Sequence, residues 1–162
     1  MAATPDDLFA LFQRLGLDTT THHHDAAFTV EQGNAIWGAI PGVHCKNLFL
    51  KDAKDRMWLV VAPADRRVDL KTLPARIGSA RLSFGSAERL GRVLGVEPGS
   101  VTPFALVNDT ARQVSVVLDA WMMRQDLLNY HPLRNTMTTT ISNAHFRAFL
   151  AATGHTTIEV DL

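Results

Sequence analysis

The chain has 162 residues, 46% of them hydrophobic and 20% charged, which is enough for a single globular domain over residues 1–162 with a sizeable core. Sixteen basic residues balance sixteen acidic residues, which excludes an overall positive field that could hold a long stretch of nucleic acid. One cysteine, no charged-then-apolar leader and no apolar run near the ~18 residues of a membrane helix favour a soluble protein of the reducing cytoplasm.

The chain opens with a helix that should begin after Thr4 and end at Gly16, because Thr4 is a good capping residue and Pro5 suits the first helical position. Residues 19–24 then favour a short strand that carries three consecutive histidines. Two of these could share a face as metal ligands, but a metal site usually recruits a third ligand and supporting carboxylates, and only Asp25 lies nearby. We therefore expect no metal and no cofactor.

The next segment predicts a helix, a turn and a β-hairpin. Residues 29–32 have the spacing of a capping box, so a helix should run from Thr29 to about Trp37. Pro41 and Gly42 turn the chain into a strand over residues 43–51, and residues 57–61 form its partner strand.

The rest of the chain alternates short helices and strands. The expected elements are a helix over Asp69–Ile77, a strand over Ala80–Phe84, a helix over Ser86–Leu94, a strand over Phe104–Val107, a strand over Val114–Leu118, an extended run over 127–141, a helix over Ser142–Gly154 and a strand over Thr157–Val160. Trp121, Met122 and Met123 are expected in the core. Helices and strands without regular βαβ spacing favour an α+β domain with a twisted mixed β-sheet and flanking helices.

The strand over residues 43–51 has one polar pair in an apolar setting. Side chains alternate along a strand, so Asn47 shares a face with Val43, Cys45 and Phe49, whereas Lys46 shares the other face with leucines. A lysine confined in this way should have a depressed pKa or face a cleft that receives an anion. The alternative is an edge-strand lysine that discourages aggregation.

Three segments together resemble a known family. They are residues 42–50, residues 99–104 and residues 130–135 with the following threonine run, and their order and spacing resemble the YbaK/ProX family of aminoacyl-tRNA editing domains. That family also occurs as an insertion inside bacterial prolyl-tRNA synthetases. The freestanding ProXp-ala (PrdX) branch, which deacylates alanyl-tRNA(Pro), is the most similar.

The resemblance implies hydrolysis of the ester that joins an amino acid to the terminal adenosine of a tRNA. Lys46 matches the family lysine that holds the phosphate or carbonyl end of the substrate, and His131 matches a histidine that orients it. The loop from Gly99 to Pro103 matches a glycine-rich loop whose backbone groups lie against the reacting carbonyl. Fixed backbone donors of this kind stabilise an oxyanion. The general base stays open among a backbone carbonyl, the ribose hydroxyl of the substrate and a neutral Lys46.

Further contacts are expected around these groups. The substrate-binding residues are Asn47, Ser100 and Pro103, with Phe28, Val30 and Leu48 as walls of the amino-acid pocket. Lys51, about 17 Å beyond Lys46 along an extended strand, and Arg81 are candidate contacts to the acceptor end of tRNA(Pro) or, alternatively, solvated charges. We expect a monomer whose weak tRNA binding is compatible with help from prolyl-tRNA synthetase or an elongation factor.

Two other functions stay open at this stage. The first keeps the enzyme class and changes the substrate to cysteinyl-tRNA(Pro) or another aminoacyl-tRNA. The second is a non-catalytic module that binds the tRNA end, because a fold does not determine a function. The presence of both Lys46 and the Gly99 loop argues against the second.

Overall fold

The computed structural model describes residues 1–26 and 37–162. In chain order the elements are α1 (Pro5–Arg14), β1 (Thr19–His23), β2 (Val43–Asp52), β3 (Met57–Pro63), α3 (Leu73–Ile77), β4 (Leu82–Phe84), α4 (Ala87–Leu94), the 3-10 helix η1 (Pro103–Asn108), β5 (Val114–Asp119), the 3-10 helix η2 (Met122–Arg124), β6 (Leu127–Tyr130), β7 (Met137–Ser142), α5 (Asn143–Thr153) and β8 (Thr157–Val160). Among the described helices, none is both long and apolar enough to cross a membrane.

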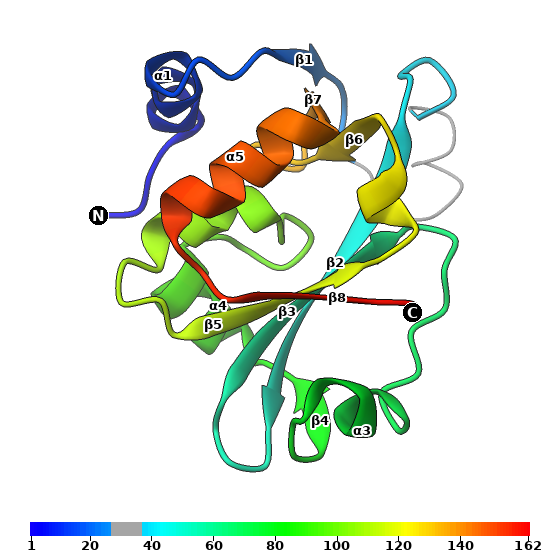
Figure 1. The fold of residues 1–162 in the computed structure, drawn as a ribbon. Helices are drawn as coiled ribbons and strands as arrows, with labels where there is room; N and C mark the ends of the chain where they lie inside the picture. Colours follow the sequence, from blue (N-terminus) through cyan, green and yellow to red (C-terminus); the bar gives the residue numbers. More distant parts are fainter. Residues whose placement is uncertain (27–36) are drawn as a thin grey trace.

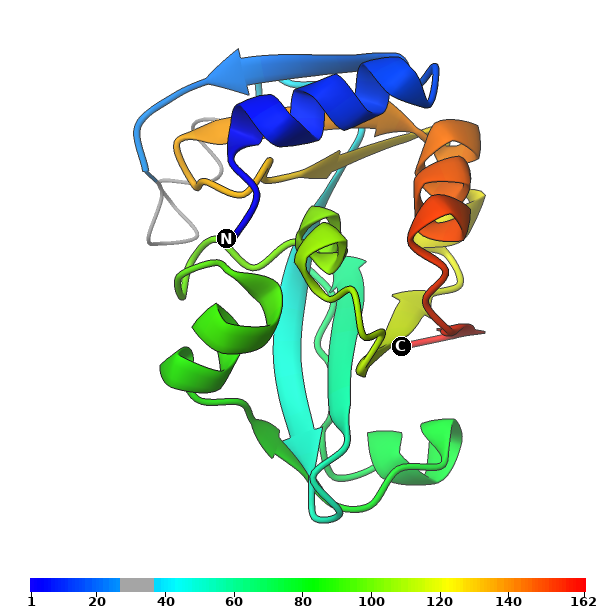
Figure 2. The same ribbon diagram turned by 90° about the vertical axis from the view of Figure 1, so that its left-hand side faces the viewer.

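The strands form one mixed sheet in the order β1-β7-β6-β2-β3-β5-β8, with β4 paired to β2. β2 pairs antiparallel with β3 and β4 but parallel with β6, so the predicted hairpin and the predicted mixed α+β sheet are confirmed. The long strands β2 and β3 connect the upper part of the molecule, which holds β1, β7 and β6, with the lower part, which holds β4 and α3 (Figures 1 and 2). β2 is therefore the strand to which both parts are attached.

The alternation predicted for β2 separates two hydrophobic clusters. Phe49 belongs to the larger cluster, against which Val43 and Cys45 also pack. Leu50 belongs to the smaller cluster, against which Leu48 packs. Both faces of the strand are therefore covered by apolar side chains, as the sequence predicted.

The helix starts follow the expected capping chemistry. Thr4 and Asp7 form a reciprocal capping box at α1, Ser86 accepts from the amide of Arg89 at α4, and Ser142 accepts from the amide of His145 at α5. α1 lies along the upper strands, and α5 runs down the side of the molecule from the end of β7 toward β8 (Figure 2). Buried residues of both helices join the larger cluster, so this end of the molecule is well anchored.

Two expected elements are corrected. The strand expected over Phe104–Val107 is the 3-10 helix η1: the Thr102 hydroxyl accepts from the Phe104 amide at 3.2 Å and Pro103 occupies the first turn. A run of four apolar residues does not distinguish a strand from a short buried helix. The helix expected from Asp69 begins only at Leu73, because the Asp69 carboxylate accepts from the Lys71 amide and caps a preceding turn instead.

The prediction for residues 121–123 is correct in part. Met122 and Met123 are buried, but Trp121 is 40% exposed, so its assignment to the core is wrong. Hydrophobicity alone predicted burial for all three, although the tight turn of η2 directs neighbouring side chains to different sides. The helix predicted from Thr29 lies, apart from Trp37, outside the described residues.

Substitution of Phe104 tests the packing of the core that supports η1. Its ring is 0% exposed and packs edge-on against Phe12, Tyr130 and Phe149 with centroid distances of 5.1, 5.7 and 5.2 Å. Phe104→Ala should lower the free energy of unfolding by about 3–5 kcal/mol, measured by urea denaturation. The matched control is Phe84→Ala, whose ring is 64% exposed and whose loss should cost less than about 0.5 kcal/mol. Equal losses for the two variants would contradict this description of the core.

Candidate active site

Lys46 and Asn47 are neighbours on β2, and both are partly buried. They point to opposite faces because successive side chains alternate along a strand. Burial lowers the pKa of Lys46, and the negative charge of Asp65 partly opposes that shift. The expectation of a lysine with a depressed pKa is confirmed in direction.

The edge of β2 between its two partners forms a gap. On one edge of β2, β6 pairs with Val43 and His44, and β4 pairs with Leu50 to Asp52. Between these two pairings, β2 has a strand partner only on its other edge, where it pairs with β3. The Phe49 carbonyl accepts from Gly85 on the gapped edge. Backbone groups alternate in direction along a strand, so the amide and carbonyl of Asn47 point to that same edge.

A small cavity lies on the Asn47 side of β2, and we call it the ester cavity. Its lining residues come from three strands and from Trp37, and they are Trp37, His44, Cys45, Asn47, Asn129, Tyr130, His131 and Thr138. Its volume is about 20 Å³, which is room for about one water molecule. Asn47 and His131, far apart in sequence, are therefore brought together as expected site residues.

The side-chain oxygen of Asn47 is buried and has no hydrogen-bond partner among the described residues. A buried acceptor without a partner is costly, and each such group calls for an explanation. Its position in the wall of the ester cavity provides one, because a donor group of a bound substrate can satisfy it there.

His131 is held in one tautomer. Its Nδ1 lies 2.9 Å from the carbonyl oxygen of Met137, and a carbonyl only accepts, so Nδ1 carries the proton and Nε2 is an acceptor in the neutral ring. Burial lowers the pKa of His131, the bond to Met137 opposes this, and the adjacent His24 ring lowers it further. His131 is therefore neutral at pH 7.

His24 supports this arrangement. Its Nδ1 donates to the carbonyl of Asp25 at 2.7 Å, and its Nε2 therefore accepts from the Thr138 hydroxyl at 2.7 Å. The His24 and His131 rings lie 6.4 Å apart. His22 and His23 alternate along β1, and no group of three potential metal ligands occurs in residues 1–26 and 37–162. The role of His24 here is to position Thr138 and the wall of the cavity.

The Gly99 loop connects α4 to η1 and passes beside the upper half of β2 (Figure 2). Gly99 has φ +89°, and a Cβ built on it would lie 3.6 Å from the side-chain nitrogen Nδ2 of Asn135, four residues after His131 in the chain. The residue therefore needs the left-handed conformation that glycine adopts freely. The loop and the segment after β6 are thus neighbours, although the residues that line the ester cavity do not include the loop.

Not every backbone amide of this loop can serve a substrate. The Ser100 amide donates to the carbonyl of Glu97 at 3.0 Å, and Ser100 and Pro103 are buried, with Pro103 opening η1. These two residues give the loop its shape.

The remaining expected site residues lie elsewhere. Leu48 is on the Lys46 face and packs on the smaller cluster, so the structure does not bring it to the ester cavity. Phe28 and Val30, the other expected walls, lie outside the described residues. None of these three expected wall residues therefore has a described role in the ester cavity.

Lys51 lies on β2, and Arg81 comes directly before the adjacent strand β4. Lys51 is opposite Ser83, the Arg81 carbonyl accepts from Ala53 at 3.0 Å, and residues directly opposite or two apart share a face. Both side chains are therefore on the Asn47 face of β2, toward β4, with Lys51 about 13 Å and Arg81 about 20 Å from Asn47 along the strand.

Six residues that line the ester cavity were not predicted as site residues: Trp37, His44, Cys45, Asn129, Tyr130 and Thr138. The Asn129 side chain donates to the Pro41 and Val43 carbonyls at 2.9 and 3.3 Å and accepts from the Thr140 hydroxyl, so it ties the turn before β2 to β6. Trp37 stacks on His44 with centroids 5.1 Å apart and an interplanar angle of 15°. The polar Asn129 within an apolar strand was the one local signal that could have been noticed.

Comparisons with known proteins identify the family of this chain. Residues 24–149 match the family model described as "Aminoacyl-tRNA editing domain". The chain is 36% identical over 156 residues to the Prolyl-tRNA editing protein ProX of Acetoanaerobium sticklandii, covering 96% of this chain and 95% of that protein. This chain belongs to the aminoacyl-tRNA editing domain family. It is also 37% identical over 154 residues to the Prolyl-tRNA synthetase associated domain-containing protein 1 of Danio rerio, covering 94% of this chain and 84% of that protein.

Solved structures show the same editing-domain fold at low sequence identity. The hypothetical protein APE2540 superimposes with a TM-score of 0.73 at 20% identity, covering 94% of this chain and 97% of that chain. A structure described as a candidate trans-editing enzyme for prolyl tRNA synthetase gives a TM-score of 0.70 at 16% identity, covering 100% of this chain and 99% of that chain. The resemblance to the YbaK/ProX family and the expected fold are confirmed.

Proposed function

We propose that this protein is a trans-editing hydrolase that deacylates mischarged alanyl-tRNA(Pro). The observation that carries the proposal is the ester cavity, whose volume of about 20 Å³ beside Asn47 and His131 suits a methyl side chain. Family membership supports a prolyl-tRNA editing role, since the curated relative ProX carries the name of a prolyl-tRNA editing protein. The partner is the acceptor end of tRNA(Pro).

We propose the following roles for the residues of the site. Lys46, partly desolvated on β2, holds the anionic end of the substrate, and charge-assisted contacts of this kind are stronger than neutral ones. Amides of the Gly99 loop stabilise the oxyanion that forms when water attacks the ester carbonyl. The Asn47 oxygen accepts from the amino group of the aminoacyl ester, and the neutral His131 ring orients the ribose or the attacking water.

The proposal is tested by a deacylation panel with tRNA(Pro) charged with alanine, cysteine, serine or proline. Alanine release should be fastest, because the ester cavity suits a methyl side chain and the side chains of cysteine, serine and proline are larger. Faster cysteine release would identify the cysteinyl-tRNA(Pro) deacylase instead. Binding of the tRNA end without turnover of any ester would identify a non-catalytic module.

The pH dependence of the reaction should report His131. Because its pKa is lowered from 6.5, the neutral ring persists through pH 7 and gains a proton only below pH 6.5. We expect kcat/KM, from rates corrected by subtracting uncatalysed hydrolysis, to be flat with respect to this group from about pH 6.5 to 8. It should fall by about tenfold per pH unit below the lowered pKa.

His131→Asn is the control for this profile. The variant should lose rate at pH 7 and also lose the acid limb. An acid limb that persists unchanged in His131→Asn would assign it to another group, such as His44, whose pKa burial also lowers. The same shifts destabilise the fold in acid: a histidine with a lower pKa in the folded state stabilises it above pH 6.5, and this stability is lost as the pH falls.

A further inference from the structure

A second cavity lies at the start of β2, and we call it the tryptophan cavity. Its volume is about 510 Å³, and it is lined by Trp37, Gly42, Val43, His44, Pro63, Ala64, Asp65 and Trp121. This volume lies within the ~300–1,000 Å³ of small-molecule sites. The ester cavity is far smaller, so the two cavities suit different parts of a ligand.

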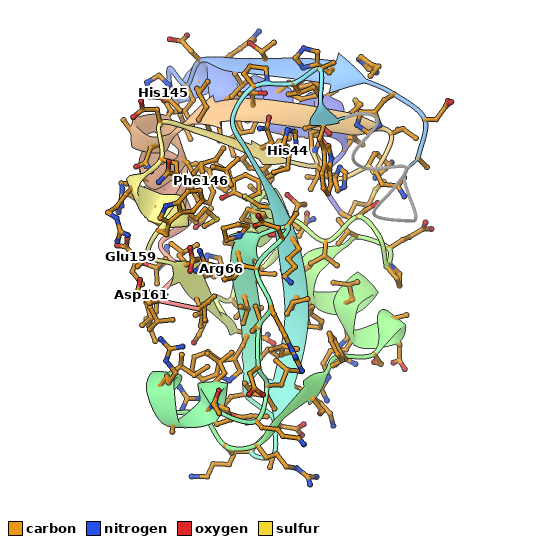
Figure 3. The ribbon with its side chains drawn as sticks, turned by 90° about the vertical axis from the view of Figure 1, so that its right-hand side faces the viewer. His44, Arg66, His145, Phe146, Glu159 and Asp161 are labelled. Carbon is orange, nitrogen blue, oxygen red and sulfur yellow. The ribbon has the colours of Figure 1, made fainter. Side chains whose placement is uncertain are left out.

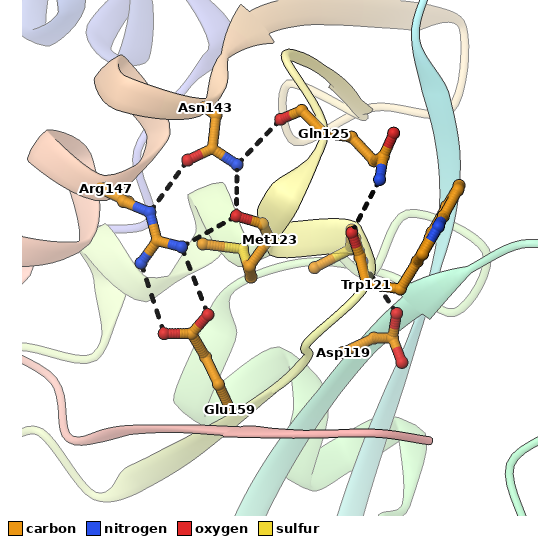
Figure 4. Close-up of polar contacts among 8 residues, drawn as sticks. Asp119, Trp121, Met123, Gln125, Asn143, Arg147 and Glu159 are labelled. Carbon is orange, nitrogen blue, oxygen red and sulfur yellow. Dashed lines mark hydrogen bonds and ion pairs between the residues drawn. The ribbon is translucent and has the colours of Figure 1, made fainter.

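Aromatic rings provide much of the wall. Trp37 stacks on His44, which lies near the upper end of β2 (Figure 3). Trp121 is 40% exposed on a backbone held in place: its carbonyl accepts from the Arg124 amide at 3.0 Å and the Gln125 side chain at 3.1 Å. Figure 4 shows the contact to Gln125. Exposed indole on a rigid turn is the arrangement that proteins use to stack nucleic-acid bases.

The two cavities share a wall. Trp37 and His44 line both of them, so a group in the tryptophan cavity is adjacent to a group in the ester cavity. In an aminoacyl-tRNA only the ribose separates the ester from the base of the terminal nucleoside. A substrate with its amino acid beside Asn47 therefore has its terminal base within reach of Trp121.

The polar groups of the wall favour one kind of base. The Asp65 carboxylate is an acceptor, so it suits the exocyclic amino group of adenine and repels a carbonyl oxygen at the same position. Arg66, the next residue, is already paired with the Asp119 carboxylate at 3.2 Å and the Leu162 carbonyl at 3.1 Å. Lys46, on the same face of β2 as His44, is thus the cation placed for the preceding phosphate.

We infer that the tryptophan cavity binds the terminal adenine of the tRNA, with Trp121 and the Trp37–His44 stack as its platforms. This inference rests on the tRNA end as ligand, as in the proposed function, but not on hydrolysis of the ester. It assigns Trp121 a role in recognition for which neither sequence nor family resemblance gave a reason.

The test measures binding and turnover separately. Equilibrium dialysis with the trinucleotide CCA should show that Trp121→Ala raises Kd by roughly 5- to 100-fold, as expected for the loss of one base stack. Trp121→Phe should restore most of the affinity. Leu15→Ala, which removes another side chain that is 40% exposed but lies at the end of α1, should leave Kd unchanged. The trinucleotide CCU should bind wild type less tightly than CCA.

Steady-state deacylation of alanyl-tRNA(Pro) provides the second readout. Trp121→Ala should raise KM by a similar factor and change kcat by less than about twofold, since the platform lies apart from the ester. If wild type binds CCA and Trp121→Ala does not, yet neither hydrolyses the ester, the adenine site stands and the proposed function fails. Turnover by both proteins with equal KM and equal Kd, or equal binding of CCA and CCU, would overturn the inference.

Discussion

Lys46→Ala is expected to fold normally and to lose deacylation of alanyl-tRNA(Pro) by a factor of about 100 or more. The side chain is a partly buried cation between His44 and Leu48 on one face of β2, and burial lowers its pKa. A fixed charge in a site of reduced water content contributes far more to a charged transition state than an exposed one, and removal of one such stabilising group typically costs about 10²–10³ in kcat. The measurement is kcat/KM from initial rates of aminoacyl ester loss.

Stability controls separate a site effect from a folding effect. Removal of a partly desolvated charge leaves no buried partner unpaired, so the free energy of unfolding of Lys46→Ala should lie within about 1 kcal/mol of wild type. Lys54→Ala, in the exposed turn between β2 and β3, is the matched charge control and should keep wild-type kcat/KM. Near wild-type activity in Lys46→Ala would remove this lysine from the site.

Local patterns predicted β2 well. The alternation of apolar residues about Lys46 and Asn47 placed the two side chains on opposite faces, and the two clusters on either side confirm that reading. The pattern did not show which face holds the ester. That depends on the pairing of His44 with Asn129, which brings β6 and His131 to the Asn47 side. Such pairings join segments far apart in sequence, so periodicity carries no information about them.

The errors have a common cause. The Phe104 segment and Trp121 were assigned from hydrophobicity, yet Phe104 is buried in a 3-10 helix and Trp121 is exposed beside a cavity. Composition indicates that such side chains prefer burial but does not indicate which ones a turn leaves outside. The tryptophan cavity could not be predicted because its walls come from Trp37, β2, the end of β3 and the turn after β5.

Alanyl-tRNA(Pro) should be deacylated about 100-fold or more faster than prolyl-tRNA(Pro). A synthetase pocket that holds proline cannot exclude alanine strongly, because each missing methylene is worth only about 1–3 kcal/mol. Errors must therefore be removed in a second, smaller pocket. The ester cavity has a volume of about 20 Å³, so the two additional ring carbons of proline overlap its walls. Overpacking costs about 1–3 kcal/mol per added group. The two free-energy costs add, so the corresponding rate factors multiply to give the expected ratio.

An enlarged cavity provides the decisive comparison. Cys45 lines the ester cavity, and its thiol, whose pKa burial raises to about 12, stays protonated and contacts the Met122 sulfur at 3.5 Å. Cys45→Ala removes one heavy atom from the wall and leaves Asn47 and His131 in place. It should raise the prolyl rate by about threefold to tenfold relative to the alanyl rate, measured as initial rates on the same tRNA. Comparable alanyl and prolyl rates in wild type would show that this cavity does not select by size. An unchanged ratio in Cys45→Ala would place the selection at other walls, because a sieve formed by this cavity must respond to its volume.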